Sequence, residues 1–168
     1  NLLDLGVSSP LLTRYGIPRL PAGTIQHRVA ICQNTDLAFV GRVIEHWKSA
    51  KGLQYNPTRQ DALKATKLAT SLEAALEDWG QKNTKLVATS ARGIAGPKPV
   101  TFTEMREITL KNPIFIVFGT GYGLENTLVR KCDYLLEPIR GRSSDGFKHL
   151  SVRSAVSIAL DRLMGSCY

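Results

Sequence analysis

Glycines follow an apolar run in the stretch Phe118–Leu124 (FGTGYGL), here called the glycine turn. Gly119, Gly121 and Gly123 have no Cβ, so backbone amides there can approach a bound ligand closely. The spacing is GxGxG, and it matches neither the GxGxxG dinucleotide fingerprint nor the P-loop pattern. The residues therefore indicate a ligand-binding turn of undefined class. A purely structural strand-to-helix turn is the alternative.

A second turn, Glu137–Gly141 (EPIRG), follows the apolar residues Leu135 and Leu136 and is here called the proline turn. It carries one carboxylate, Glu137, and one guanidinium, Arg140. In open α/β sheets, ligands bind outside the carboxyl ends of the strands. Since the glycine turn also follows an apolar run, we expect both turns at one sheet edge. A surface ion pair between Glu137 and Arg140 is the alternative, and it would carry little energy.

Two further stretches place polar groups at the end of a strand or the start of a helix. His149, Ser151 and Arg153 lie where the last helix is predicted to begin, and helix N-termini bind anions through unpaired amides. The alternatives are that His149 has only a structural role and that Ser151 is only a helix cap. Val87–Arg92 (VATSAR) is another predicted strand that ends in polar residues, which could also contact a ligand. The alternative is a strand that simply leaves the core.

Short apolar runs separated by helical patterns indicate the elements that position these groups. Buried parallel strands are predicted at 85–90, 114–118 and 134–136, which favours an α/β fold with a parallel sheet flanked by helices. The two glycines and two prolines between 93 and 99 predict a loop. A first helix is predicted from about residue 36 and ends at Lys51-Gly52, and a short helix follows Asn56-Pro57. Further helices are predicted over 71–79, 103–108, 124–131 and 152–163, and Gly165 lies just beyond the last.

The composition suits one soluble domain over residues 1–168 with an anionic partner. A net charge of +8 and a pI near 9.6 favour nucleic acid, because Lys and Arg gain affinity for phosphates through counterion release. No apolar run approaches the roughly 20 residues of a membrane span. The three cysteines, Cys32, Cys132 and Cys167, have neither metal-type nor disulfide-type spacing, so a reducing, cytoplasmic location is expected. The chain begins at Asn1 without Met, and we expect native residues to be missing in front.

The ordered series of motifs resembles the predicted S-adenosylmethionine (SAM)-dependent RNA methyltransferases of the SPOUT, or α/β-knot, superfamily. The stretches that carry the resemblance are VATSAR at 87–92, IFIVFGTGYGL at 114–124, YLLEPIRG at 134–141 and HLSVRSAVSIALDRL at 149–163. RVIEHW at 42–47 and YNPTRQDAL at 55–63 support it. The resemblance covers about residues 36–165.

The resemblance implies a parallel sheet flanked by helices with a C-terminal deep trefoil knot of SPOUT type at about 114–165. It also implies a homodimer, a SAM cofactor without a metal, and an RNA substrate such as tRNA or rRNA. Family members begin with a strand that we do not find in this sequence. Their first helix carries a paired-arginine pattern, for which Arg14 is the only counterpart here, and Pro10 would disturb a helix.

By the same resemblance, three turns and the start of the last helix would hold the cofactor, with Leu136, Ile139 and Leu150 as apolar walls for the adenine. The implied cofactor-binding residues are Thr89, Ser90, Phe118, Gly119, Thr120, Gly121, Gly123, Leu136, Pro138, Ile139, Gly141, His149, Leu150 and Ser151.

The sulfonium of SAM is already a strong electrophile, so the chain's task is to align the acceptor, exclude water and help remove a proton. We expect Arg140 and Arg153 to contact RNA phosphate or the cofactor carboxylate, and Glu137, His149 or Ser151 to assist the acceptor. Two other functions stay open. A knotted RNA-binding protein could keep the SAM pocket without catalysis, and a flavodoxin-like nucleotide-binding regulator would have an unknotted C-terminus.

Overall fold

The structure is a computed structural model that describes residues 29–31, 37–55, 66–119, 122–141 and 150–165. The chain divides into two compact units, residues 1–80 and 81–168, and each is described by itself. The expectation of one domain stays a prediction. Within the described ranges, no helix is both long enough and apolar enough to cross a membrane.

The described residues of the first unit form a small parallel sheet and three helices. The strands β1 (Val29–Ile31) and β2 (Thr66–Leu68) pair in parallel, with Val29 opposite Thr66. The helices are α2 (Leu37–Lys48), α3 (Ala50–Tyr55) and α5 (Leu72–Trp79). Neither strand was predicted from the sequence, because three residues are too few to show the alternation of apolar and polar residues that is typical of a strand. The cap of α5 is Ser71, whose side chain accepts a hydrogen bond from the Ala74 backbone, and the helix ends at Gly80 with φ 62°.

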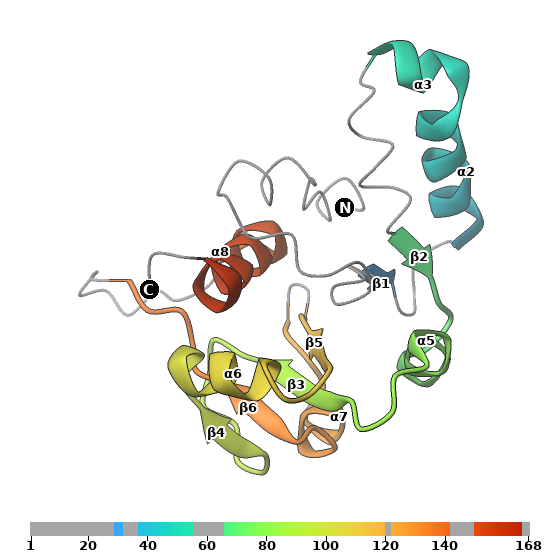
Figure 1. The fold of residues 1–168 in the computed structure, drawn as a ribbon. Coiled ribbons are helices and arrows are strands. Elements are labelled where there is room, and N and C mark those ends of the chain that lie inside the picture. The colour runs from blue at the N-terminus through green and yellow to red at the C-terminus, as the bar shows by residue number, and fades with distance from the viewer. Residues whose placement is uncertain (1–28, 32–36, 56–65, 120–121, 142–149, 166–168) are drawn as a thin grey trace. The chain divides into compact units, whose positions relative to one another are not determined.

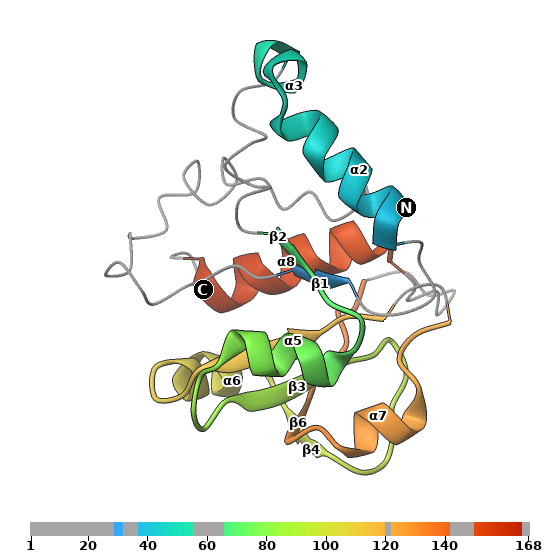
Figure 2. The same cartoon turned by 90° about the vertical axis from the view of Figure 1, so that its right-hand side faces the viewer.

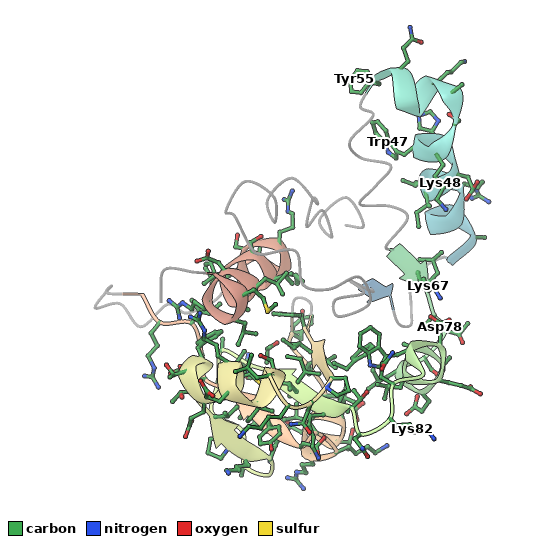
Figure 3. The ribbon with its side chains drawn as sticks, viewed as in Figure 1. Trp47, Lys48, Tyr55, Lys67, Asp78 and Lys82 are labelled. Carbon is green, nitrogen blue, oxygen red and sulfur yellow. The ribbon has the colours of Figure 1, made fainter. Side chains whose placement is uncertain are left out.

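The first predicted helix ends earlier than expected. Lys51 and Gly52, predicted to end it, lie inside α3, and the break comes at Ser49. The Ser49 hydroxyl donates to the His46 carbonyl at 2.6 Å, so it competes with the helical backbone. Across the break, the ring centroids of Trp47 and Tyr55 lie 6.0 Å apart. Both residues are labelled in Figure 3. The helix predicted after Asn56-Pro57 lies outside the described residues.

The second unit contains a four-stranded sheet in which every pairing is parallel. The order is β4 (Lys98–Val100), β6 (Tyr134–Leu136), β3 (Lys85–Thr89) and β5 (Ile114–Val117). The last strand, β6, thus lies between β3 and β4, which are consecutive in sequence (Figure 1). The three predicted strands are confirmed within one residue.

Helices cover both faces of this sheet, as predicted. Side chains alternate along a strand, so Val87 and Leu136 face one way while Ala88 and Leu135 face the other. On the first face lie α6 (Phe102–Thr109) and α8 (Val152–Met164), whose Phe102, Met105, Ala159 and Leu163 complete a buried core. On the second lies α7 (Asn126–Arg130), which can be followed in Figure 2. Its Val129 is fully buried.

One strand occurs where a loop was predicted. The stretch 93–99, with two glycines and two prolines, runs into β4, which contains Pro99. Proline cannot donate a hydrogen bond to a neighbouring strand, but an outermost strand tolerates it. β4 is an outermost strand of this sheet. The prediction of a loop up to residue 99 is therefore wrong at its C-terminal end.

Candidate functional site

The three predicted ligand turns follow neighbouring strands and leave the sheet at the same edge, here called the carboxyl edge. Thr89 at the end of β3 lies opposite Leu136 at the end of β6, and Ala88 lies opposite Val117 at the end of β5. The Thr89 hydroxyl also donates a hydrogen bond to the Val117 carbonyl at 2.9 Å. The expectation that the glycine turn and the proline turn share one edge is confirmed.

The glycine turn closes so tightly that a side chain at its first glycine has no room. A Cβ built on Gly119 would collide with the carbonyl carbon of Gly123 and would lie 2.5 Å from the Leu124 nitrogen. Gly123 itself has φ 88°, a conformation that favours glycine. Gly119 therefore brings two stretches of backbone together at the end of β5. Thr120 and Gly121 lie outside the described residues.

Tyr122 lies in the glycine turn and is fully exposed, at 101%. The candidate site residues predicted in this turn were Phe118, Gly119, Thr120, Gly121 and Gly123, and Tyr122 was missed. The signal was present, because an aromatic residue flanked by two glycines cannot be buried by its own turn. An exposed ring at the carboxyl edge can stack on a flat ligand or on an RNA base.

The proline turn is joined to the start of α6 by its carboxylate. Glu137 donates its backbone N–H to the Val100 carbonyl at 2.9 Å, and its Oε1 accepts a hydrogen bond from the Phe102 N–H at 2.7 Å. A carboxylate at a helix N-terminus satisfies an unpaired amide and complements the helix dipole. The alternative of a surface ion pair with Arg140 is thus not the contact that the structure gives Glu137.

Glu104 supplies a second carboxylate to the same helix end. Its Oε2 accepts from both the backbone and the hydroxyl of Thr101 at 2.8 Å, and Thr101 Oγ1 accepts from the Glu104 N–H at 3.2 Å. This capping box holds the start of α6. The backbone hydrogen bond from Thr101 is the main cause that lowers the pKa of Glu104, and the Thr101 hydroxyl adds to it.

The far end of α8 packs against α6 and fixes that helix from the other side. Arg106 donates to the Gly165 carbonyl at 2.8 Å, and the Arg162 guanidinium lies 5.1 Å from the centre of the Phe102 ring. Met105 is fully buried in the same core. The start of α6, to which the proline turn is tied, is therefore a rigid support.

The remaining predicted site residues differ in how the structure engages them. Ser151 caps α8, accepting from the Ser154 N–H at 3.3 Å, so the predicted cap is confirmed. Ser90 Oγ accepts from the Arg92 N–H at 3.0 Å. Arg140, Gly141 and Arg153 are exposed, while Phe118, Pro138 and Ile139 are half-buried. His149 lies outside the described residues.

The apolar walls predicted for an adenine are not equally open. Leu150 is 45% exposed, whereas Leu136 is only 2% exposed and belongs to the core beneath the sheet. Because the side chain of Leu136 is already buried, its backbone rather than its side chain is available to contact a ligand. Within the described part of the chain, His, Cys, Asp and Glu side chains form no group that could hold a metal ion.

Two solved structures are similar to this chain in fold. A probable methylase family protein from Haemophilus influenzae matches with a TM-score of 0.57 at 19% identity, over 84% of this chain and 66% of that one. A probable methyltransferase from Bordetella pertussis matches with a TM-score of 0.59 at 16% identity, over 98% of this chain and 88% of that one. At such identities the likeness establishes a methyltransferase-like α/β fold.

Similarity in sequence identifies the family within the methyltransferase-like fold. The model of a SAM-dependent RNA methyltransferase family matches residues 26–165, so the chain belongs to that family, in which SAM is the methyl donor. A tRNA (guanine-N(1)-)-methyltransferase of Nitratidesulfovibrio vulgaris is 38% identical over 129 residues, 75% of this chain and 29% of that protein. An uncharacterized protein of Aquifex aeolicus is 39% identical over 129 residues, 74% of this chain and 61% of that protein. The chain thus spans less than a third of the named relative.

Proposed function

We propose that this protein transfers the methyl group of SAM to a nucleotide of tRNA or rRNA. The observation that carries the proposal is the convergence of three turns on neighbouring strand ends, in a chain that belongs to a SAM-dependent RNA methyltransferase family. Ligands of open α/β sheets bind at this edge. When bound, SAM supplies an activated methyl group on its sulfonium.

The residues of the carboxyl edge suit that cofactor. The closure at Gly119 leaves backbone, rather than side chains, to line the end of β5, and backbone groups can recognise an adenine edge. We propose that backbone of Thr89, Ser90, Gly119, Gly123 and Leu136 holds SAM. The other predicted contacts, including Thr120, Gly121 and His149, stay predictions.

For the RNA, the exposed guanidinium groups of Arg140 and Arg153 are proposed to contact phosphate or the cofactor carboxylate. Removal of the acceptor proton stays assigned to Glu137, His149 or Ser151. The hydrogen bond from Phe102 N–H to Glu137 supports a different role for Glu137, as a positioning residue that holds the proline turn against α6.

The substrate class rests on the family and on the name of one group of relatives. Because the chain spans only 29% of the N. vulgaris protein, its guanine-N1 activity is not carried to this chain, and tRNA is proposed only as the first substrate to test. The trefoil knot of SPOUT type at about 114–165, the homodimer and a cytoplasmic location are likewise proposals. The position of β6 between β3 and β4 supports the knot, because the last strand enters between two strands joined by an earlier loop.

The test is transfer of labelled methyl from SAM to RNA. Purified protein is incubated with labelled SAM and, separately, with tRNA and rRNA from a strain that lacks the gene. We expect label in one RNA class, and nucleoside analysis then identifies the methylated position. SAM binding by calorimetry without transfer to either RNA would favour the non-catalytic RNA-binding alternative. Absence of SAM binding would contradict both.

A further inference from the structure

At the edge of the four-stranded sheet opposite the candidate site, a basic residue lies at the start of each strand or three residues before it. In sheet order, these are Lys111 before β5, Lys85 at the start of β3, Lys131 before β6 and Lys98 at the start of β4. Neighbouring strands lie about 4.8 Å apart, so the row extends over roughly 15 Å. Arg130 and Lys82 extend it. We call this row the basic edge.

The structure brings these residues together by strand register. Lys85 is paired with Ile114, three residues after Lys111, and Lys98 is paired with Tyr134, three residues after Lys131. Arg130 lies against the loop that leads to β4, since a Cβ on Gly96 would be 3.1 Å from its Cγ. Lys82 precedes β3 and is labelled in Figure 3. Charges far apart in sequence thus share one edge.

Most of these side chains are exposed, and their acidic neighbours are few. Lys82, Lys98, Lys111, Arg130 and Lys131 are all exposed, and Lys85 is partly so. Asp133 lies on the same edge, but its carboxylate accepts the Leu86 N–H at 2.8 Å and lies 3.9 Å from Lys85 Nζ. Glu107 precedes Lys111 by one helical turn, and Glu104 interacts electrostatically with Lys98. The basic edge therefore keeps an excess of positive charge.

Helix ends explain only part of this row. Lys111, Arg130 and Lys131 lie at or just beyond the C-terminal ends of α6 and α7, where a cation is stabilised by the helix dipole. Lys82 likewise follows the end of α5, whereas Lys85 and Lys98 lie inside strands. A row of positive charges that local structure does not require is the footprint expected for a polyanion.

We propose that the basic edge binds the phosphate backbone of the substrate RNA at a distance from the methylated nucleotide. This inference rests on the proposed function. The carboxyl edge then holds SAM and the reacting nucleotide, while the basic edge adds affinity that does not depend on sequence. Phosphate contacts position an RNA without reading its bases, so the basic edge affects RNA affinity and leaves SAM binding unchanged.

The test is the salt dependence of tRNA binding, measured by fluorescence anisotropy with labelled total tRNA. Each phosphate contact contributes about 0.7 to 0.9 to the slope of log K against log salt concentration. The variant Lys98→Gln/Lys131→Gln is expected to lower the slope by about 1.5 and to weaken binding about tenfold near 0.1 M salt. Adding Lys111→Gln and Arg130→Gln should roughly double the loss of slope.

The matched control is Lys48→Gln/Lys51→Gln, which removes two exposed lysines from α2 and α3. It should leave the slope nearly unchanged, and all variants should bind SAM as the wild type does. An equal loss in the control would mean that only net charge matters, and would overturn the basic edge. An unchanged slope in the quadruple variant would also overturn it, while wild-type methyl transfer in the same preparation would leave the proposed function standing.

Discussion

The two edges of the four-stranded sheet carry different chemistry. At the carboxyl edge, hydrogen bonds to the backbone hold two polar side chains, Thr89 at the Val117 carbonyl and Glu137 at the Phe102 N–H, and Arg140 is exposed beside them. At the basic edge, long cationic side chains extend into solvent. The first arrangement suits one small ligand in a fixed geometry, and the second suits a large polyanion. The basic edge adds RNA affinity away from the cofactor, so variants there should leave SAM binding intact.

The largest effect is expected from closing the glycine turn. Gly119→Ala places a Cβ against the Gly123 carbonyl carbon, so the turn must open. SAM affinity should fall more than about 100-fold, because only glycine allows this close approach of two backbone segments. Calorimetry measures the affinity, and far-UV circular dichroism checks that the variant is folded.

Gly41→Ala is the matched control, because a Cβ at Gly41 meets nothing within 4 Å. Alanine inside α2 should leave SAM affinity unchanged and raise stability by about 0.5 to 1 kcal/mol. Wild-type SAM affinity in a folded Gly119→Ala protein would show that the glycine turn is only structural.

A smaller effect is expected from releasing the proline turn. Glu137→Ala leaves the Phe102 N–H without its acceptor, a loss of about 1 to 2 kcal/mol, and should weaken SAM binding by about tenfold. Glu137→Gln keeps an oxygen acceptor and should restore most of the affinity and the wild-type pH profile of methyl transfer. If both variants bind SAM normally but lose methyl transfer, Glu137 is the general base and the positioning role is wrong.

The smallest effect concerns the stability of α6. The pKa of Glu104 is lowered in the folded state, so the carboxylate stabilises the fold above the unfolded value of 4.5 and loses that effect as pH falls through the folded value. Glu104→Ala should therefore lower the melting temperature by a few degrees at pH 7 and by less at pH 3. Glu107→Ala, on the same helix but outside the capping box, is the control and should leave the melting temperature nearly unchanged. An equal loss at both pH values would argue against the capping box.

The sequence predicted the core of the second unit well, because its strands are short apolar runs between clear helices. It also placed the glycine and proline turns at one edge, since parallel strands end on the same side. It missed β4, where Pro99 conceals an edge strand, and it missed the basic edge. Lys98, Lys111 and Lys131 are scattered in sequence, and only strand register brings them into one row. Likewise, the bond between Glu137 and Phe102 joins residues 35 positions apart and has no local signal.

Hydrogen exchange measured by mass spectrometry, with and without SAM, tests the central claim most directly. Ligand binding slows exchange where it contacts or orders the backbone. The cofactor should protect peptides that contain the carboxyl-edge turns after Thr89, Val117 and Leu136, and should leave those at the starts of β3, β5 and β6 unchanged. Protection confined to the basic edge, or SAM binding that protects none of the three turns, would contradict the account.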